Sequence, residues 1–299
     1  MAHAISTHAL TKQFKNRKVV DSVSMTVPTG TVYGLIGPKD AGKSTLIRMI
    51  LGLLPPTSGQ VDVLGTPMNR HNAKQLVNRI GAMVDGPPGY NHLTASENMH
   101  IVQDMLGLTK RQVDRALDMV RLTPHRDKLI RTYSLGMRQR LGIAMVLARN
   151  PELIILDEPT NGLDVAGIEE IRLLLSQLAS RGTTVLVTGH KLDEVDNMAH
   201  VVGIIDDGKL LFEGTRDALE THTAPDLVIE TPDRTGAVSQ ITGAIPIPGG
   251  IMVRKVSHVE SAKVIQRLAL AGIPIYEVRR VPRSLEEVFV NLTPDGAAQ

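Results

Sequence analysis

The sequence predicts an α/β protein with a mixed core sheet, an antiparallel β layer, a helical subdomain and a small C-terminal α/β domain. Three observations support this prediction. Apolar strands alternate with amphipathic helices, as in parallel sheets. A helix-rich stretch interrupts them, and short proline-punctuated segments follow residue 218. We expect one domain at 1–218, with the helical subdomain at about 90–148, and a second domain at 219–299.

The N-terminal segments alternate apolar and polar residues in the way that half-buried strands do. "AISTHALTKQF" and "VVDSVSMTVPTG" therefore predict an antiparallel layer. "GTVYGLIG" is a short apolar strand that leads into a glycine-rich turn, and "KSTLIRMILGLL" then has the apolar spacing of a helix. We expect this helix to end near Pro55 and Pro56, since proline stops helices.

A helical pattern occupies the middle of the chain, from Thr94 to about Arg131. "TASE" has the form of a capping box, with Thr94 as the N-cap and Glu97 three residues later. Apolar residues recur at helical spacing further on: Val113, Leu117 and Val120.

The pattern then returns to strand, helix and strand. "LIILDE" and "TTVLVTG" are apolar strands, and the amphipathic helix between them, "VAGIEEIRLLLSQLASRG", should end at Gly182. "VVGIIDDGKLLFEGT" predicts a hairpin that turns at Asp207 and Gly208. In the C-terminal domain we expect helices at Ser261–Ala271 and Ser284–Asn291.

The composition argues against several classes of function. Thirty-three Lys and Arg against 31 Asp and Glu give a net charge of +2, and aromatic residues make up only 2%. Both values disfavour a nucleic-acid-binding protein, which needs cations for phosphates and rings for bases. With no cysteine, disulfides and thiolate metal sites are excluded. We find neither a secretion signal nor an apolar run long enough to span a bilayer, so any membrane contact should involve another chain.

The stretch "GPKDAGKS", from Gly37 to Ser44, has the pattern G-x-x-x-x-G-K-S/T between a predicted strand and a predicted helix. In that setting backbone N–H groups and the helix N-terminus face phosphates, Lys43 adds a positive charge, and Ser44 can ligate Mg²⁺. A chance glycine-rich turn would not need both flanking elements. The residues that we expect to contact the phosphates are Gly37, Lys39, Asp40, Ala41, Gly42, Lys43, Ser44 and Thr45.

"LIILDEPT" delivers two carboxylates to the carboxyl end of a buried strand, where α/β sheets bind ligands. Asp157 is placed to hold Mg²⁺, and Glu158 to polarise a water molecule for attack on a phosphate. A third element, "YSLGMRQRLG", sets Ser134 and Gly136 at the start of an amphipathic helix. A hydroxyl, free N–H groups and a helix dipole form a second anion site, which suggests that this helix meets the nucleotide of a partner.

These motifs resemble, in order and spacing, those of the ATP-binding-cassette ATPases over roughly residues 4–218. "GPKDAGKS" is similar to the Walker A loop, "LIILDE" to Walker B, "YSLGMRQR" to a degenerate signature motif and "NGLD" to the D-loop. The resemblance implies a P-loop NTPase fold with an ABC-cassette core that binds ATP and Mg²⁺. It also implies that Lys43 and Glu158 are catalytic, with His190 as the switch histidine, and that Phe14 stacks on adenine.

In this family two cassettes form a head-to-tail ATP sandwich, in which Ser134 and Gly136 complete the site of the other copy. The sandwich drives a transmembrane permease, so the resemblance implies a cytoplasmic protein bound peripherally to the inner face of the membrane. "YSLGM", "NGLD-x-AGI" and the terminal "SLEEVFVNLT" resemble the bacitracin- and lantibiotic-export branch. The implied function is export of a peptide antibiotic for self-protection, or multidrug export.

The chain departs from the family at two places. Lys39 and Asp40 replace Asn and Gly in the loop, and we expect the Asp40 carboxylate to weaken ATP binding unless Lys39 and Mg²⁺ offset its charge. Asp85 stands where the family has a magnesium-sensing Gln, or a Glu in the antibiotic-export branch. We interpret Asp85 as a third metal ligand beside Ser44 and Asp157, with a simple turn residue as the alternative.

Two other classes of function stay open at this stage. A soluble cassette protein that acts on DNA or ribosomes usually carries two cassettes or a long coiled coil, and this chain has neither. A regulatory module that binds nucleotide with little or no hydrolysis would explain the altered glycine loop. We expect the permease to bind the region from Asp85 to Leu93, in a groove lined by Met83, Pro87, Tyr90 and Leu93, unless these residues belong to the core.

Overall fold

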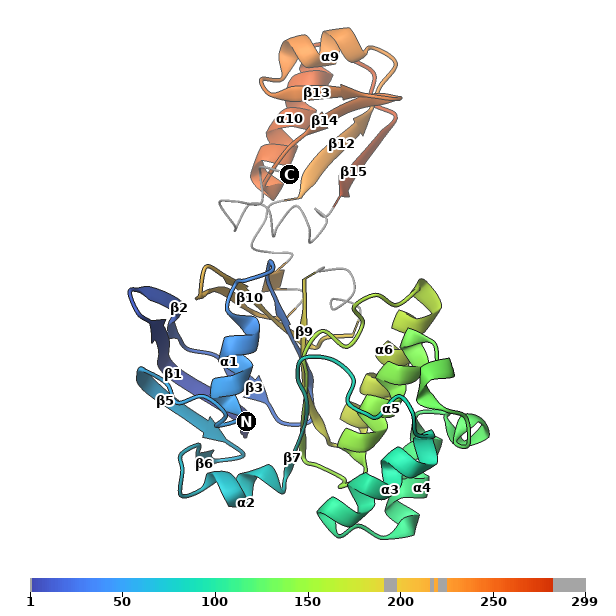
Figure 1. Cartoon of the computed structure of the whole chain (residues 1–299). Helices are drawn as coiled ribbons and strands as arrows, with labels where there is room; N and C mark the ends of the chain where they lie inside the picture. The colour runs from blue at the N-terminus through green and yellow to red at the C-terminus, as the bar shows by residue number, and fades with distance from the viewer. Residues whose placement is uncertain (1, 191–197, 216–217, 220–224, 282–299) are drawn as a thin grey trace. The chain divides into compact units, whose positions relative to one another are not determined.

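The computed structural model describes residues 2–190, 198–215, 218, 219 and 225–281 (Figure 1). The chain forms two compact units, Met1–Gly214 and Thr215–Gln299. The boundary thus follows Gly214, whereas the sequence suggested residue 218. Among the described residues no helix combines the length and the apolar content that crossing a bilayer demands.

The N-terminal strands form the antiparallel layer of the first unit. Within the described residues its order is β2-β1-β5-β6, with β3 paired to β1. The strands are β1 (His3–Phe14), β2 (Arg17–Val23), β3 (Thr26–Pro28), β5 (Ser58–Val63) and β6 (Thr66–Pro67). The alternating pattern of β1 and β2 puts one side of this layer into the core, where Ile5, Leu10 and Val20 are fully buried.

The second sheet of this unit is the parallel core. Its order within the described residues is β11-β10-β4-β9-β8-β7, and all neighbours are parallel except the β10–β11 hairpin. The strands are β4 (Val32–Ile36), β7 (Ile80–Met83), β8 (Leu153–Leu156), β9 (Thr184–Gly189), β10 (Val201–Asp206) and β11 (Lys209–Gly214). The mixed sheet, the antiparallel layer and the hairpin turn at Asp207 and Gly208 confirm the prediction.

Helix α1 (Lys43–Ile50) lies between the two sheets, and its apolar residues share one buried cluster with side chains of both (Figure 1). The helix ends at Ile50, earlier than the expected Pro55, because Gly52 adopts a φ of 70° and turns the chain back. Helices α5 (Leu135–Leu147) and α6 (Val165–Ser180) contact the core sheet through β7 and β9. The short α2 (Ala73–Val77) precedes β7.

The predicted helical subdomain is present between β7 and β8. It contains α3 (Ala95–Leu106), α4 (Lys110–Met119), the 3₁₀ turns Thr123–His125 and Ile130–Thr132, and α5. The capping box at Thr94 and Glu97 forms as expected, and Thr109 with Gln112 forms a second one. Val113, Leu117 and Val120 are buried, in agreement with their helical spacing.

The second unit has its own sheet and its own core. Strands β12 (Asp226–Glu230), β13 (Ala244–Ile247), β14 (Gly250–Val253) and β15 (Glu277–Val281) form an antiparallel sheet in the order β13-β14-β12-β15. With α9 (Arg234–Gln240) and α10 (His258–Leu270), this is a β-α-β-β-α-β arrangement. Helix α10 begins before the expected Ser261 because Ser257 caps it. The helix expected at Ser284–Asn291 lies outside the described residues.

Candidate functional site

The glycine loop connects β4 to α1, and two of its glycines touch neighbouring backbone. A Cβ built on Gly37 would lie 2.2 Å from the carbonyl oxygen of Ile205, and one on Gly42 would lie 2.4 Å from that of Val19. Gly42 also has a φ of 99°, which disfavours other residues. The rear of the loop is therefore packed against β2 and β10, and only glycine fits at these two positions.

Lys43, the first residue of α1, turns its ammonium group back into the loop. Its Nζ donates to the carbonyl oxygens of Gly37 and Pro38, at 2.7 and 2.8 Å, and lies 3.7 Å from Oε1 of Glu158. The side chain is only 5% exposed, and this burial lowers the pKa of Lys43, although the nearby charges of Glu158 and Asp157 counteract it. Lys43 thus lies beside the end of β8.

Ser44 and Asp157 form a pair of hard oxygen donors. Ser44 Oγ donates to Oδ2 of Asp157 at 2.8 Å, and Thr188 Oγ1 donates to Oδ1 of the same carboxylate at 2.5 Å. Within the described part of the chain no group of three or more His, Asp or Glu side chains could enclose a metal ion. Mg²⁺ commonly takes one or two protein ligands and completes its shell with phosphate and water, so this donor pair fits it.

Glu158 follows Asp157 with a backbone φ of 48°, a conformation that is uncommon outside glycine. Its N–H donates to Thr188 Oγ1 at 2.9 Å. Its Oε2 accepts from the Asn161 amide at 3.2 Å and lies 3.8 Å from Nδ1 of His190. The strained turn therefore points the two successive carboxylates at different partners, Asp157 toward Ser44 and Glu158 toward Lys43 and His190.

Thr188 is a site residue that the sequence analysis missed. It is fully buried in β9, and its hydroxyl binds both Asp157 and the N–H of Glu158. The signal in the sequence was the threonine that directly follows the apolar run "VLV" and precedes Gly189. A buried hydroxyl needs a hydrogen-bond partner, and the end of the adjacent strand supplies it.

Lys39 and Asp40 occupy the exposed part of the loop. Asp40 adopts a φ of 68°, as expected where the family has glycine, and its charge reaches Lys43 as one of the weaker influences that raise the pKa of that lysine. Ala41 is buried at 3% exposure, and Thr45 is half-buried on α1. The loop thus retains the course that a glycine would give it.

Asp85, which we interpreted from the sequence as a Mg²⁺ ligand, forms an ion pair with Arg48. Both of its carboxylate oxygens accept from an Arg48 guanidinium nitrogen, at 2.8 and 2.9 Å, and the side chain is 66% exposed. Arg48 lies on α1 one turn after Ser44. Asp85 as a magnesium ligand stays a prediction, because it would first have to leave Arg48. Met83 is 2% exposed, so it belongs to the core, and its expected place in a docking groove is wrong.

The remaining predicted residues lie apart from this group. Phe14, at the end of β1, is 45% exposed, and the Lys12 ammonium lies 5.2 Å from its ring centroid. Ser134 caps α5 and accepts from the N–H of Met137 at 3.2 Å. Among the described residues, no hydrogen bond or ion pair joins Ser134 or Gly136 to Lys43, Asp157 or Glu158. Ser134 and Leu135 at the tip of α5 are exposed.

Comparison with known proteins agrees with this geometry. Residues 20–161 match the model of the family described as ABC transporter. The chain is 39% identical to the bacitracin transport ATP-binding protein BcrA of Bacillus licheniformis over 99% of both proteins. It is also 39% identical to the lantibiotic transport ATP-binding protein SrtF of Streptococcus pyogenes, over 71% of this chain and 90% of SrtF.

A solved structure supports the same assignment. The dimeric, post-hydrolysis ATP-binding cassette MJ0796 with bound ADP and Pi aligns with a TM-score of 0.64 and 25% identity, over 71% of this chain and 98% of the cassette. Sequence identity above 30% along the whole chain, the matching fold and the convergence of the phosphate loop with the acidic strand lead to one conclusion. The chain belongs to the ABC transporter family, as one of its ATP-binding and ATP-hydrolysing subunits.

Proposed function

We propose that this ATPase energises export of a peptide antibiotic, of the bacitracin or lantibiotic kind, through a separate membrane permease. The observation that carries the proposal is the convergence of Lys43, Ser44, Asp157, Glu158 and His190 at the carboxyl ends of β8 and β9. The names of the relatives BcrA and SrtF support the class of cargo. Multidrug export is the second candidate cargo class.

We assign the roles in the site from these contacts. Backbone N–H groups of the glycine loop and Lys43 would bind the β- and γ-phosphates, while Ser44 and Asp157 would hold Mg²⁺. The ion neutralises phosphate charge when it is bound. Lys43 now donates to carbonyl groups of its own loop, and a phosphate is the stronger acceptor for it. Phe14, exposed at the end of β1, is the proposed adenine contact.

Glu158 is the proposed general base. One of its oxygens lies near Lys43, and the other is shared by Asn161 and His190, so the carboxylate is held from two sides. It would accept a proton from the water that attacks the γ-phosphate. Thr188 fixes the backbone N–H of Glu158 and also binds Asp157, so it acts as a positioning residue.

Ser134 and Gly136 support a head-to-tail pair of cassettes. They lie at the exposed N-terminus of α5, where unpaired N–H groups and the helix dipole favour an anion. Because these residues lie apart from the Lys43 group of their own chain, the phosphate they bind would belong to a second copy. The dimeric cassette MJ0796 supports this arrangement by analogy.

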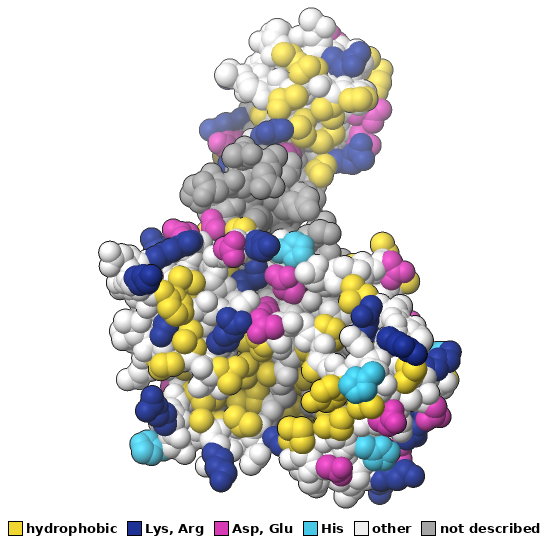
Figure 2. Space-filling view, in the orientation of Figure 1, with side chains coloured by type: hydrophobic (Ala, Val, Ile, Leu, Met, Phe, Trp, Pro, Cys, Tyr) yellow, Lys and Arg dark blue, Asp and Glu magenta, His cyan; other side chains and the backbone are white. Residues whose placement is uncertain are grey.

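The permease would bind the first unit at the loop that follows β7. Tyr90 is 56% exposed there, and Pro87 and Leu93 are half-buried. Figure 2 shows apolar side chains gathered on the lower part of the visible face of this unit, which suits a protein partner. This contact would keep the protein at the cytoplasmic face of the membrane, and we propose no nucleic-acid partner.

Two measurements test this proposal. In purified full-length protein with Mg²⁺ and ATP, Glu158→Gln should lower kcat by at least about 100-fold while ATP still binds, since a general base contributes 10²–10⁴-fold. Asn161→Ala, which removes only one of the contacts to Glu158, should retain more activity. Equal turnover in the wild type and Glu158→Gln would remove Glu158 as the general base. A wild type that binds ATP without hydrolysing it would favour the nucleotide-binding module with little or no hydrolysis.

The cargo requires a cellular test. A sensitive host that carries this chain and its permease should tolerate bacitracin or a lantibiotic at raised concentration, and Glu158→Gln should abolish the tolerance. Unchanged sensitivity to both antibiotics, with an intact ATPase, would contradict the proposed cargo.

A further inference from the structure

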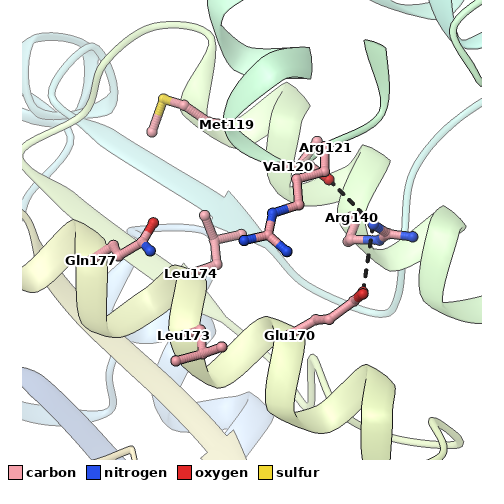
Figure 3. A pocket seen from close by; sticks show the side chains of 8 residues that line it. All are labelled: Met119, Val120, Arg121, Arg140, Glu170, Leu173, Leu174 and Gln177. Atoms are coloured by element: carbon pink, nitrogen blue, oxygen red, sulfur yellow. Dashed lines mark hydrogen bonds and ion pairs between the residues drawn. The ribbon is translucent and has the colours of Figure 1, made fainter. Parts of the chain in front are cut away.

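Helices α4, α5 and α6 meet around a small cavity on the side of the first unit (Figure 3). The C-terminal end of α4 contributes Val120 and Arg121, α5 contributes Arg140, and α6 contributes Glu170 and Leu174. In Figure 3 the guanidinium group of Arg140 extends between the end of α4 and the face of α6. Arg140 is thus the side chain of α5 that reaches both neighbouring helices.

Arg140 makes two polar contacts in this cavity. Its Nη1 lies 3.5 Å from the carbonyl oxygen of Val120 and 3.5 Å from Oε2 of Glu170, and its side chain is 19% exposed. Val120 is the C-cap of α4, where helix carbonyls are unpaired and the dipole is negative. A single guanidinium group therefore compensates a helix end and a carboxylate at the same time.

The beginning of α5 also touches the loop that leads into α6. A Cβ built on Gly136 would lie 3.7 Å from Leu163, and one on Gly162 would lie 2.8 Å from Leu135. Ser134 caps α5 and Asp164 caps α6. The first contact is therefore between the tip of α5 and the loop before α6.

The second contact is further along both helices. Arg140 comes six residues after Ser134, and Glu170 six residues after Asp164, a distance of about 9 Å along each axis at 1.5 Å per residue. Helix α5 packs on α4 and β7 through its buried residues, and the ion pair adds a polar contact between its exposed side and α6. This contact restrains the direction of α5 relative to α6.

We propose that Arg140 is a positioning residue for the head-to-tail ATP sandwich. By holding Glu170 and the end of α4, it fixes the direction in which Ser134 and Gly136 face the nucleotide of the second copy. The inference rests on the proposed sandwich and deepens it. It assigns Arg140 no contact with nucleotide, so binding of ATP to the chain's own glycine loop is independent of this residue.

The test uses the full chain in the Glu158→Gln background, so that ATP is retained. Arg140→Met should weaken ATP-dependent dimerisation about tenfold, measured by analytical ultracentrifugation. Each dimer contains two copies of the Arg140–Glu170 contact. Loss of one partly exposed ion pair should weaken the dimer about threefold, so loss of both gives about tenfold. ATP affinity of the monomer, measured with a fluorescent ATP analogue at low protein concentration, should change less than about twofold.

Further variants separate a positioning role from loss of folding. Glu170→Gln removes the charge of the residue that pairs with Arg140, and it should also weaken the dimer. The double exchange of Arg140→Glu with Glu170→Arg should restore part of the dimer affinity. Arg115→Met, which removes an exposed arginine of α4, is the matched control and should dimerise normally. Thermal unfolding checks that each variant is folded.

The outcomes are distinct. A dimer of unchanged strength in Arg140→Met, or an equal loss of monomer ATP affinity, would overturn the role of Arg140. Failure of the Glu158→Gln parent itself to dimerise with ATP would overturn the sandwich, and this inference with it.

Discussion

At the scale of single residues, the carboxylate of Asp40 is the feature that separates this glycine loop from the usual one. It is exposed and has a φ of 68°, and its charge is close enough to influence Lys43. A negative charge beside a phosphate site repels the ligand, although solvent reduces the effect.

We expect Asp40→Gly to tighten ATP binding about threefold, as befits an exposed charge interaction of up to about 1 kcal/mol. The effect should shrink at high salt. Isothermal titration calorimetry of the full chain with ATP, at low and at high salt, measures the affinity and its salt dependence. Lys39→Met, which removes the adjacent positive charge, should act in the opposite direction. Unchanged or weaker binding in Asp40→Gly would disprove the electrostatic argument.

Lys43 makes the stability of the fold depend on pH, and the burial of its side chain determines the sign of this dependence. Burial lowers the pKa of Lys43 below its usual value of 10.5, so the folded protein loses this proton at a lower pH than the unfolded chain does. Between the pKa of Lys43 in the folded protein and that in the unfolded chain, the unfolded chain binds more protons than the folded protein does. The stability that this group contributes therefore rises with pH in that range.

The free energy of unfolding of the wild type, relative to Lys43→Met, should therefore increase as the pH rises toward 10.5. Urea unfolding without nucleotide measures this difference. Lys39→Met, which removes an exposed lysine of the same loop, is the control and should follow the wild type. A difference that falls with pH would show that neighbouring carboxylates outweigh burial at Lys43.

At the scale of elements, the ion pair of Arg48 and Asp85 ties the loop after β7 to the helix that carries Ser44. If Asp85 is a magnesium ligand, the pair competes with the metal. Arg48→Met should then lower the Mg²⁺ concentration for half-maximal hydrolysis about threefold, since exposed pairs contribute up to about 1 kcal/mol.

Adding Asp85→Asn to Arg48→Met should cancel that gain. Arg79→Met is the matched control, because Arg79 forms an ion pair of similar exposure with Glu152, elsewhere on the core sheet. An unchanged Mg²⁺ requirement in Arg48→Met would remove Asp85 from the proposed metal site.

Elements with a strong local signal were predictable, and those without one were not. The sequence predicted β4, β8, β9, α6 and the capping box at Thr94, because each depends on local residues. It did not predict β5 or β7, since "SGQVDV" and "IGAM" have fewer large apolar residues and their strand character comes from pairing with β1 and β8. Tertiary contacts override weak local preference in such segments.

The same distinction holds for the site. The positions of Lys43, Ser44, Asp157 and Glu158 follow from motifs that occupy loop and strand ends. Two features do not: the positive φ of Glu158 and the buried hydroxyl of Thr188. Both depend on β8 and β9 being neighbours in the sheet. Asp157 and Thr188 are 31 positions apart in the chain, so local sequence patterns do not reveal that they are in contact. The partner of Asp85 was missed for the same reason.

At the scale of the whole molecule, each unit has a hydrophobic core of its own among the residues that the structure describes. One includes Ile5, Leu46 and Leu186 of the first unit, and the other includes Leu227, Ile251 and Leu268 of the second. Each unit thus has the independent core that defines a domain.

We expect two transitions in differential scanning calorimetry, with Mg²⁺ and ATP raising only the one that belongs to residues 1–214. The Glu158→Gln chain prevents turnover during the scan. At a ligand concentration of 100 Kd the stabilisation should be about 2.7 kcal/mol. A single transition that shifts as a whole would show that the two units unfold together.

The close packing behind the glycine loop has a consequence for the thermodynamics of nucleotide binding. With the carbonyl groups of Ile205 and Val19 against Gly37 and Gly42, the backbone of this loop has little freedom to lose when a triphosphate arrives. The entropy cost of nucleotide binding should therefore fall mainly on side chains such as Lys39 and less on the backbone of the loop.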